Sequence, residues 1–139
     1  MLKLPSLGEL DHQMAVRIYL CVGPTDMRRG FDTLASAVQA FLKHDPFSGN
    51  LFLFVSRGKD RMKILYWDKD GFALWYKRLE EGAFKLPAVK PAAPGQAAPA
   101  SVELLATELA MLLEGIDLKS IKRNKRFERS SGTQAVPAA

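Results

Sequence analysis

The residues best suited to chemistry lie in one charged turn, which covers Gly23–Gly30. It contains one acid, Asp26, and two adjacent arginines, Arg28 and Arg29. Two glycines and a proline allow a special backbone path, because only glycine takes a positive φ without steric cost. The turn therefore predicts either an anion site at the start of a helix or a structural turn whose acid or threonine caps that helix. The structural part of the turn is assigned to Thr25, Asp26 and Gly30.

Basic residues form four groups along the chain, and the first two lie in predicted turns. Arginine suits a phosphate partner because its planar guanidinium meets two phosphate oxygens at once, whereas lysine contributes charge without that geometry. Basic loops beside exposed aromatic side chains are typical of nucleic-acid contacts. A solvated surface without a partner is the alternative interpretation. The candidate binding residues are Arg28 and Arg29, then Arg57, Lys59 and Arg61, then Lys77 and Arg78, and finally Lys122, Arg123, Lys125 and Arg126.

Residue types and spacing exclude several kinds of catalytic site. Cys21, His12 and His44 lack the spacing of a zinc site, and no glycine-rich phosphate-binding loop occurs. With only two histidines, a nucleophile with a well-placed base is not expected. The carboxylates lie mostly on predicted turns and helix surfaces, so no cluster for two-metal phosphoryl transfer is predicted. We therefore expect no enzyme activity, no metal and no cofactor.

Composition indicates one folded domain with an anionic partner. The chain has 139 residues, of which 47% are hydrophobic and 25% are charged, as in ordinary globular proteins. A net charge of +5 favours an anionic partner. The single cysteine excludes an intrachain disulfide and is typical of a reducing compartment. No apolar run reaches the length of a membrane span, so a cytoplasmic protein without membrane contact is expected.

Hydrophobic periodicity predicts the elements on both sides of the turn. Val16–Val22 alternates like a strand, and Phe31–Lys43 repeats apolar residues at helical spacing. Leu51–Val55 and Met62–Trp67 predict a β-hairpin with a charged tip.

The segment after this hairpin has apolar residues at i, i+3, i+4 and i+7, which predicts a helix over Phe72–Glu81. A strand is the competing interpretation, because aromatic residues favour strands. One further short strand is expected over Phe84–Leu86.

The C-terminal third has a different composition. Residues 88–100 are mostly alanine and proline, which predicts a semi-extended linker. Ser101 is expected to cap a helix over Val102–Glu114, whose wide apolar surface must pack on the core or on a partner. The expected organisation is an α+β core at 1–87 with a loose arm at 1–15, a linker at 88–100, a C-terminal helix at 101–118 and a basic, largely disordered tail at 119–139.

Four blocks of sequence together resemble a known family. They are Thr25-Asp26-Met27-Arg28-Arg29-Gly30, Lys63-Ile64-Leu65-Tyr66-Trp67-Asp68, the run from Gly71 to Phe84, and Leu112-Leu113-Glu114-Gly115-Ile116-Asp117. In this order the chain resembles the TnpB-type accessory protein, the second reading frame (Orf2-like), of bacterial insertion sequence 66 transposable elements. The resemblance covers about Val16 to Asp117 apart from the linker. It implies a role in transposition beside a separate transposase, with no activity assigned to this component.

The expected fold is α+β, with helices packed on one face of a small, mainly antiparallel sheet. The expected function is that of a non-catalytic accessory protein that binds DNA, the transposase, or both. DNA contacts should go to the phosphate backbone with weak sequence preference, because no recognition helix is evident. The alternatives are a small enzyme with an anion site at Thr25–Gly30 and a purely structural assembly subunit. A homo-oligomer is compatible with the wide apolar surface of the last helix. The sheet is expected to comprise Val16–Val22, Leu51–Val55, Met62–Trp67 and Phe84–Leu86.

Overall fold

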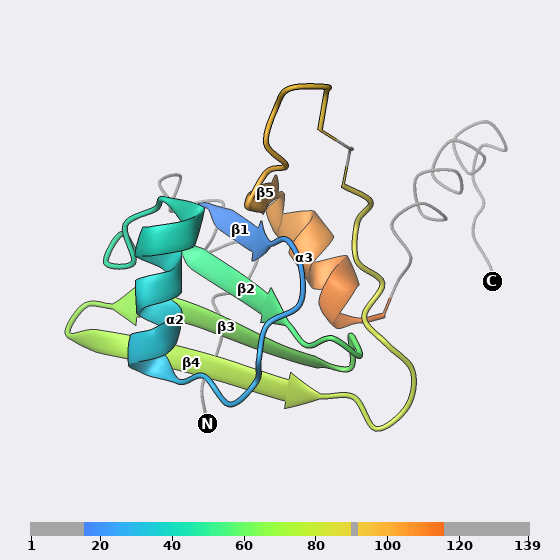
Figure 1. Cartoon of the computed structure of the whole chain (residues 1–139). Coiled ribbons are helices and arrows are strands. Elements are labelled where there is room, and N and C mark those ends of the chain that lie inside the picture. The colour runs from blue at the N-terminus through green and yellow to red at the C-terminus, as the bar shows by residue number, and fades with distance from the viewer. Residues whose placement is uncertain (1–15, 90–91, 116–139) are drawn as a thin grey trace, which may run out of the picture.

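A mixed sheet organises the part of the chain that the structure describes, residues 16–89 and 92–115 of a computed structural model. Within these residues it has five strands in the order β4-β3-β2-β1-β5 (Figure 1). β1 and β2 are parallel, and the other neighbouring pairs are antiparallel. The α+β class with a mainly antiparallel sheet is thus confirmed. The strands are β1 Ile18–Cys21, β2 Leu51–Val55, β3 Arg61–Asp68, β4 Gly71–Arg78 and β5 Ser101–Leu104.

The charged turn and a helix connect the two parallel strands. The helix predicted from Phe31 is present as α2 (Phe31–Ala37), which continues into a π-helical turn, η1 (Val38–Leu42). Lys43 then takes a left-handed φ of 61° and ends the helix. The buried side chains of this layer are Leu34, Val38 and Leu42 from the helix, and Phe52, Phe54 and Leu65 from the sheet.

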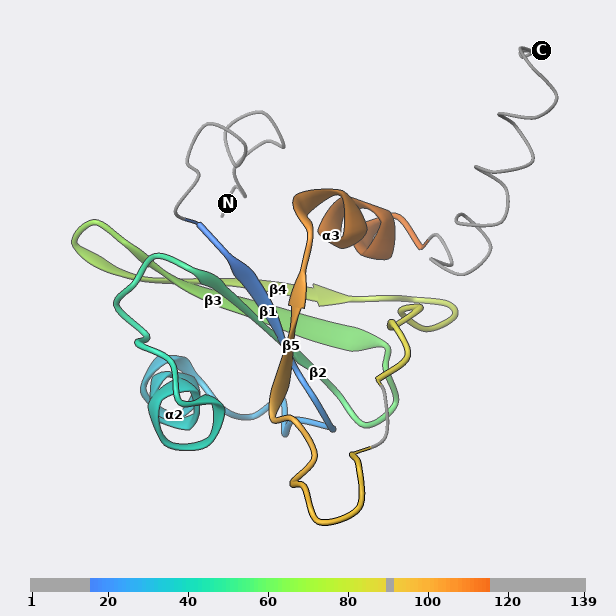
Figure 2. The ribbon, with the colours of Figure 1, turned by 90° about the horizontal axis from the view of Figure 1, so that it is seen from above.

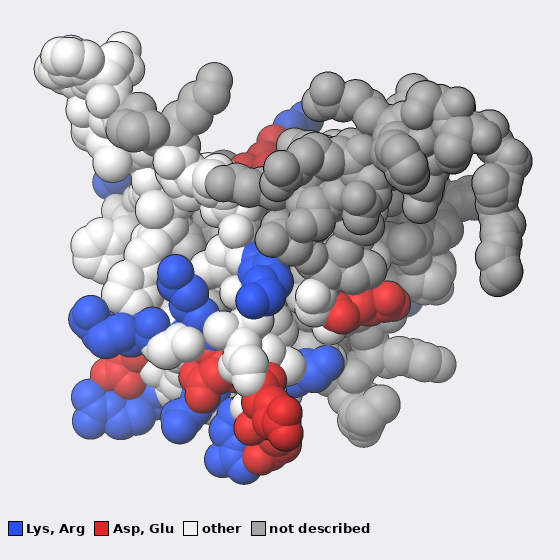
Figure 3. Space-filling model, turned by 90° about the vertical axis from the view of Figure 1, so that its right-hand side faces the viewer, with Lys and Arg blue, Asp and Glu red and all other residues white. Residues whose placement is uncertain are grey.

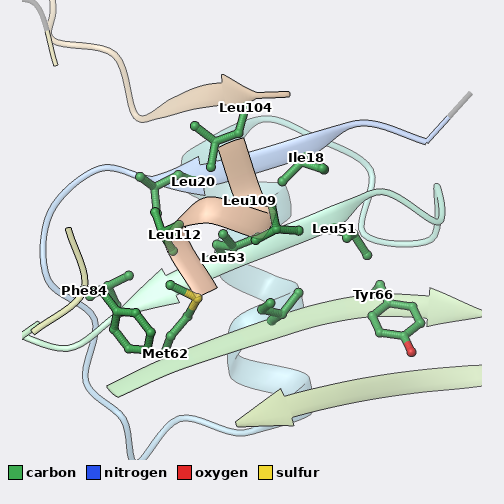
Figure 4. Packing of buried hydrophobic residues seen from close by; sticks show 12 residues of the cluster. Ile18, Leu20, Leu51, Leu53, Met62, Tyr66, Phe84, Leu104, Leu109 and Leu112 are labelled. Carbon is green, nitrogen blue, oxygen red and sulfur yellow. The ribbon is translucent and has the colours of Figure 1, made fainter. Parts of the chain in front are cut away.

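A second helix, α3 (Ala106–Leu113), covers the other face of the sheet (Figure 2). Its Leu109 and Leu112 pack into the larger buried cluster (Figure 4). Helices on a single face were expected, and this packing is not confirmed, because the two buried clusters lie on opposite sides of the sheet. The cause is β2, which is buried at every position and supplies alternate side chains to both clusters.

The helix predicted over Phe72–Glu81 was wrong, because most of this segment belongs to β4. Trp75 and Ala73 pack on the α3 side of the sheet, whereas Phe72 and Leu74 pack on the α2 side. With apolar residues on both faces, the alternation typical of a strand is hidden and a helical spacing arises by chance. The competing interpretation as a strand is the one that the structure confirms.

Two smaller expectations also fail. Residues Phe84–Leu86 form no strand, although Phe84 is buried and its N–H donates a hydrogen bond to the Lys59 carbonyl at 2.7 Å. Ser101 does not cap a helix, because Ser101–Leu104 is strand β5 beside β1, and α3 begins only at Ala106. The alternating burial of Val102 and Leu104 against the sheet outweighs the helical spacing that continues into α3. The expected arm at 1–15 and tail at 119–139 lie outside the described residues.

Candidate functional site

The charged turn is organised by an ion pair between neighbours. The Asp26 carboxylate accepts hydrogen bonds from the Arg28 backbone N–H at 2.9 Å and from the Arg28 guanidinium, of which the shortest is 2.7 Å. The Arg28 side chain, followed by its backbone N–H, lowers the pKa of Asp26 to about 2. Asp26 is therefore ionised at neutral pH and fixes the guanidinium beside the turn.

Neither Thr25 nor Asp26 caps α2, so the predicted cap was wrong. The residue before the helix is Gly30, whose N–H donates to the Thr33 hydroxyl at 3.4 Å. The Thr25 N–H instead donates to the Val55 carbonyl at 2.8 Å and ties the turn to the end of β2. Because Asp26 bonds to Arg28 two residues later, it stabilises the turn rather than the helix.

Lys63, on β3, holds the other end of the turn. Its ammonium donates to the carbonyls of Met27 at 2.8 Å and Arg29 at 2.7 Å, and it lies 4.7 Å from the centre of the Tyr76 ring. Lys63 is 7% exposed, and no other charged residue is buried in the described part of the chain. Lys63 was not among the site residues predicted from the sequence. The available signal was a lysine inside an otherwise apolar strand.

The hairpin tip between β2 and β3 lies against this turn. The Ser56 hydroxyl donates to the Asp60 carboxylate at 3.1 Å and accepts from the Arg61 N–H at 3.1 Å, which gives the tip a defined shape. The turn and the tip enclose a groove of about 410 Å³. We call it the arginine groove. Its lining residues are Thr25, Asp26, Met27 and Arg28 from the turn, and Ser56, Arg57, Gly58, Asp60 and Arg61 from the tip.

Arg78 extends the positive charge along the sheet. It is the register partner of Arg61 across β3 and β4, so both side chains lie on the same face. Its pair with Glu80, at 3.3 Å, is exposed and therefore contributes little to stability. Figure 3 views the side of the molecule where the hairpin tip lies, and basic side chains gather in its lower part with acidic ones among them.

The structure thus brings together four of the predicted residues, Arg28, Arg57, Arg61 and Arg78. Arg29 lines a separate hollow beside α2, and Lys59 lines another hollow that it shares with Arg57. Lys77 pairs with Met62, whose side chain faces α3, and therefore lies on the opposite face of the sheet. The basic residues of the tail, Lys122, Arg123, Lys125 and Arg126, lie outside the described residues.

A membrane span is not found among the helices of the described residues, none of which is both long and apolar enough to serve as one.

One family model and two curated relatives each match most of this chain. The model of a family described as IS66 Orf2 like protein matches residues 16–123, which include the turn, the hairpin tip and both helices. The chain is similar to two curated proteins of Sinorhizobium fredii whose names describe them as uncharacterized. One, y4hO, is 41% identical over 102 residues, which are 73% of this chain and 82% of the relative. The other, y4jC, is 34% identical over 108 residues, which are 78% and 86%. No solved structure matches the chain significantly.

Proposed function

Since the chain belongs to the IS66 Orf2-like family, an accessory component of insertion sequences, we propose that it acts by holding nucleic-acid backbone in the arginine groove. In this proposal it contributes binding rather than catalysis, and a separate transposase performs the chemistry. The observation that carries the proposal is the meeting of Arg28 with Arg57 and Arg61 in one groove, although the turn and the tip are far apart in the sequence.

The groove suits phosphate because its arginines are exposed and only partly engaged. Asp26 engages the Nε and Nη2 atoms of Arg28, so other N–H groups of its five donors are left for a phosphate. Bidentate contacts between a guanidinium and phosphate oxygens are among the stronger hydrogen bonds in proteins. The groove presents no helix to the major groove of DNA. Contacts limited to the backbone position the protein without reading sequence.

The proposal predicts binding of duplex DNA that weakens as salt rises. If three to six phosphates are neutralised, log affinity should fall against log salt with a slope of about −3 to −5. The double variant Arg57→Ala/Arg61→Ala should make that slope shallower by about 2 and weaken binding to unrelated sequences alike. Fluorescence anisotropy with labelled duplexes at several salt concentrations measures both quantities.

A matched control removes the same charge elsewhere. Lys43→Ala/Lys69→Ala changes two exposed lysines, one at the end of η1 and one in the β3–β4 turn, outside the arginine groove. Its salt slope should be close to that of the native protein. Binding that does not respond to salt, or no binding at low salt, would contradict the proposal.

The transposase of the same element is a second candidate partner. Phe41 is 68% exposed, and it borders a hollow of about 320 Å³ whose other lining residues include Pro24, Leu34 and Leu42. Arg29 and Asp26 also line this hollow, but most of its lining residues are apolar. An exposed aromatic ring beside a mostly apolar hollow fits a protein side chain better than a phosphate. We expect Phe41→Asp to reduce co-purification with the transposase and to leave duplex binding within about twofold. Equal recovery of the transposase would contradict this second assignment. Binding to a second copy of the chain stays a prediction.

A further inference from the structure

We propose that the preferred ligand is an unpaired nucleic-acid strand, with one base stacked on Tyr76 and its neighbouring phosphates on Arg61 and Arg78. The inference rests on the proposed function and makes it more specific, because it names the kind of nucleic acid that binds at Arg61 of the arginine groove and at the neighbouring residues of β4.

The first support is the alternation of side chains across β3 and β4. Leu65 and Leu74 pack toward α2. Two residues nearer the hairpin tip, the register partners are Lys63 and Tyr76, and after two more residues they are Arg61 and Arg78. Because alternate residues of a strand share a face, all of these side chains lie on the α2 side of the sheet.

The second support is the way the Tyr76 ring is held. Tyr76 is 50% exposed. The Lys63 ammonium lies over one side of the ring at 4.7 Å from its centre, and two carbonyls of the charged turn fix that ammonium. The ring is therefore held from the Lys63 side, and half of the residue's surface is accessible to solvent. Its same-face neighbour Leu74 packs into the α2-side cluster, whereas Tyr76 is not part of that cluster.

The third support is reach. Residues two apart on a strand are separated by about 7 Å, so a base on Tyr76 places its own backbone within reach of the long side chains of Arg61 and Arg78. Both arginines are exposed. A duplex covers the faces of its bases by stacking, whereas an unpaired strand offers them to aromatic side chains. A fixed ring beside two guanidiniums is what stacking and phosphate contact together require.

The test compares labelled oligo(dU), oligo(U) and a DNA duplex of equal length by fluorescence anisotropy at low salt. The native protein should bind at least one unpaired strand more tightly than the duplex. A preference between the two strands identifies the sugar that the site accepts, and equal binding identifies a site that accepts both. Tyr76→Ala should weaken binding of the unpaired strand about 5- to 150-fold and leave the duplex within about twofold.

Two variants separate stacking from folding. Tyr76→Phe keeps the π face and should retain most of the affinity. Tyr76→Leu keeps apolar bulk without a π face and should lose it, and thermal unfolding confirms that each variant is folded. Phe47→Ala is the matched control, because this ring is 57% exposed but packs on Trp67 near the other end of β3. It should not change the affinity.

The outcomes separate the inference from the function on which it rests. An unchanged affinity of folded Tyr76→Leu for unpaired strands, or an equal loss for strand and duplex, would overturn the inference while salt-dependent duplex binding preserved the proposed function. Binding of none of the three nucleic acids by the native protein would overturn both, and Tyr76 would then be assigned to a protein interface.

Discussion

Replacement of Leu112 by alanine should lower the free energy of unfolding by about 2–5 kcal/mol, as expected for a large buried aliphatic side chain. Leu112 is fully buried in the cluster between α3 and the sheet, where it lies near Leu20 and Met62 (Figure 4). The alanine would leave a cavity there, because the sheet and α3 can shift only a little to fill the space. Urea unfolding followed by circular dichroism measures the change.

The control for this prediction is Leu105→Ala. Leu105 precedes α3 and is 68% exposed, so its replacement should change the free energy of unfolding by less than about 1 kcal/mol. If Leu112→Ala were as stable as the native protein, α3 would not dock on this core. The wide apolar surface noted in the sequence would then belong to an interface with a partner.

The elements with clear periods and clear turn residues could be predicted from sequence. β2 and β3 are separated by a polar, charged tip, and their predicted bounds differ from the observed bounds by one residue at most. α2 begins at the residue where the apolar repeat changes from two to the helical spacing, directly after Gly30. In both places the local preference and the tertiary contacts agree, so either is a sufficient guide.

The missed elements are those whose local sequence pattern favours a different structure from the one that their tertiary contacts impose. β4 carries aromatic residues on both faces because each face packs on a different helix layer, so a period of two is absent. β5 has helical spacing continuous with α3. It nevertheless pairs with β1, which lies 80 or more residues earlier in the sequence, as in the pair Tyr19 and Glu103. Such pairing depends on contacts between distant parts of the chain, so a short stretch of sequence does not reveal it.

The candidate site was likewise predicted only in part. The turn and the hairpin tip could each be singled out by their charges, and Arg28, Arg57 and Arg61 were named on that ground. Their meeting in one groove depends on the Thr25–Val55 hydrogen bond and on β2 lying beside β1, neither of which a motif reveals. Lys63 was missed because a lysine in a strand is ordinarily assigned to solvent, whereas here the carbonyls that it binds come from a turn 34 and 36 residues earlier.

Replacement of Lys63 by methionine should lower the free energy of unfolding by about 2–4 kcal/mol, because hydrogen bonds from a charged group are lost and two carbonyls are left without their donor. Methionine keeps the packing of the lysine stem, so the loss reports the ammonium contacts with Met27 and Arg29. The turn should also leave its position beside the tip, which should weaken DNA binding beyond the effect of one lost charge. Urea unfolding and anisotropy on the same samples measure the two effects.

The control is Lys77→Met on the neighbouring strand, where the lysine is exposed and the expected change in the free energy of unfolding is below about 0.5 kcal/mol. Native stability in Lys63→Met would mean that the Thr25–Val55 hydrogen bond and the Asp26–Arg28 pair hold the turn without the lysine.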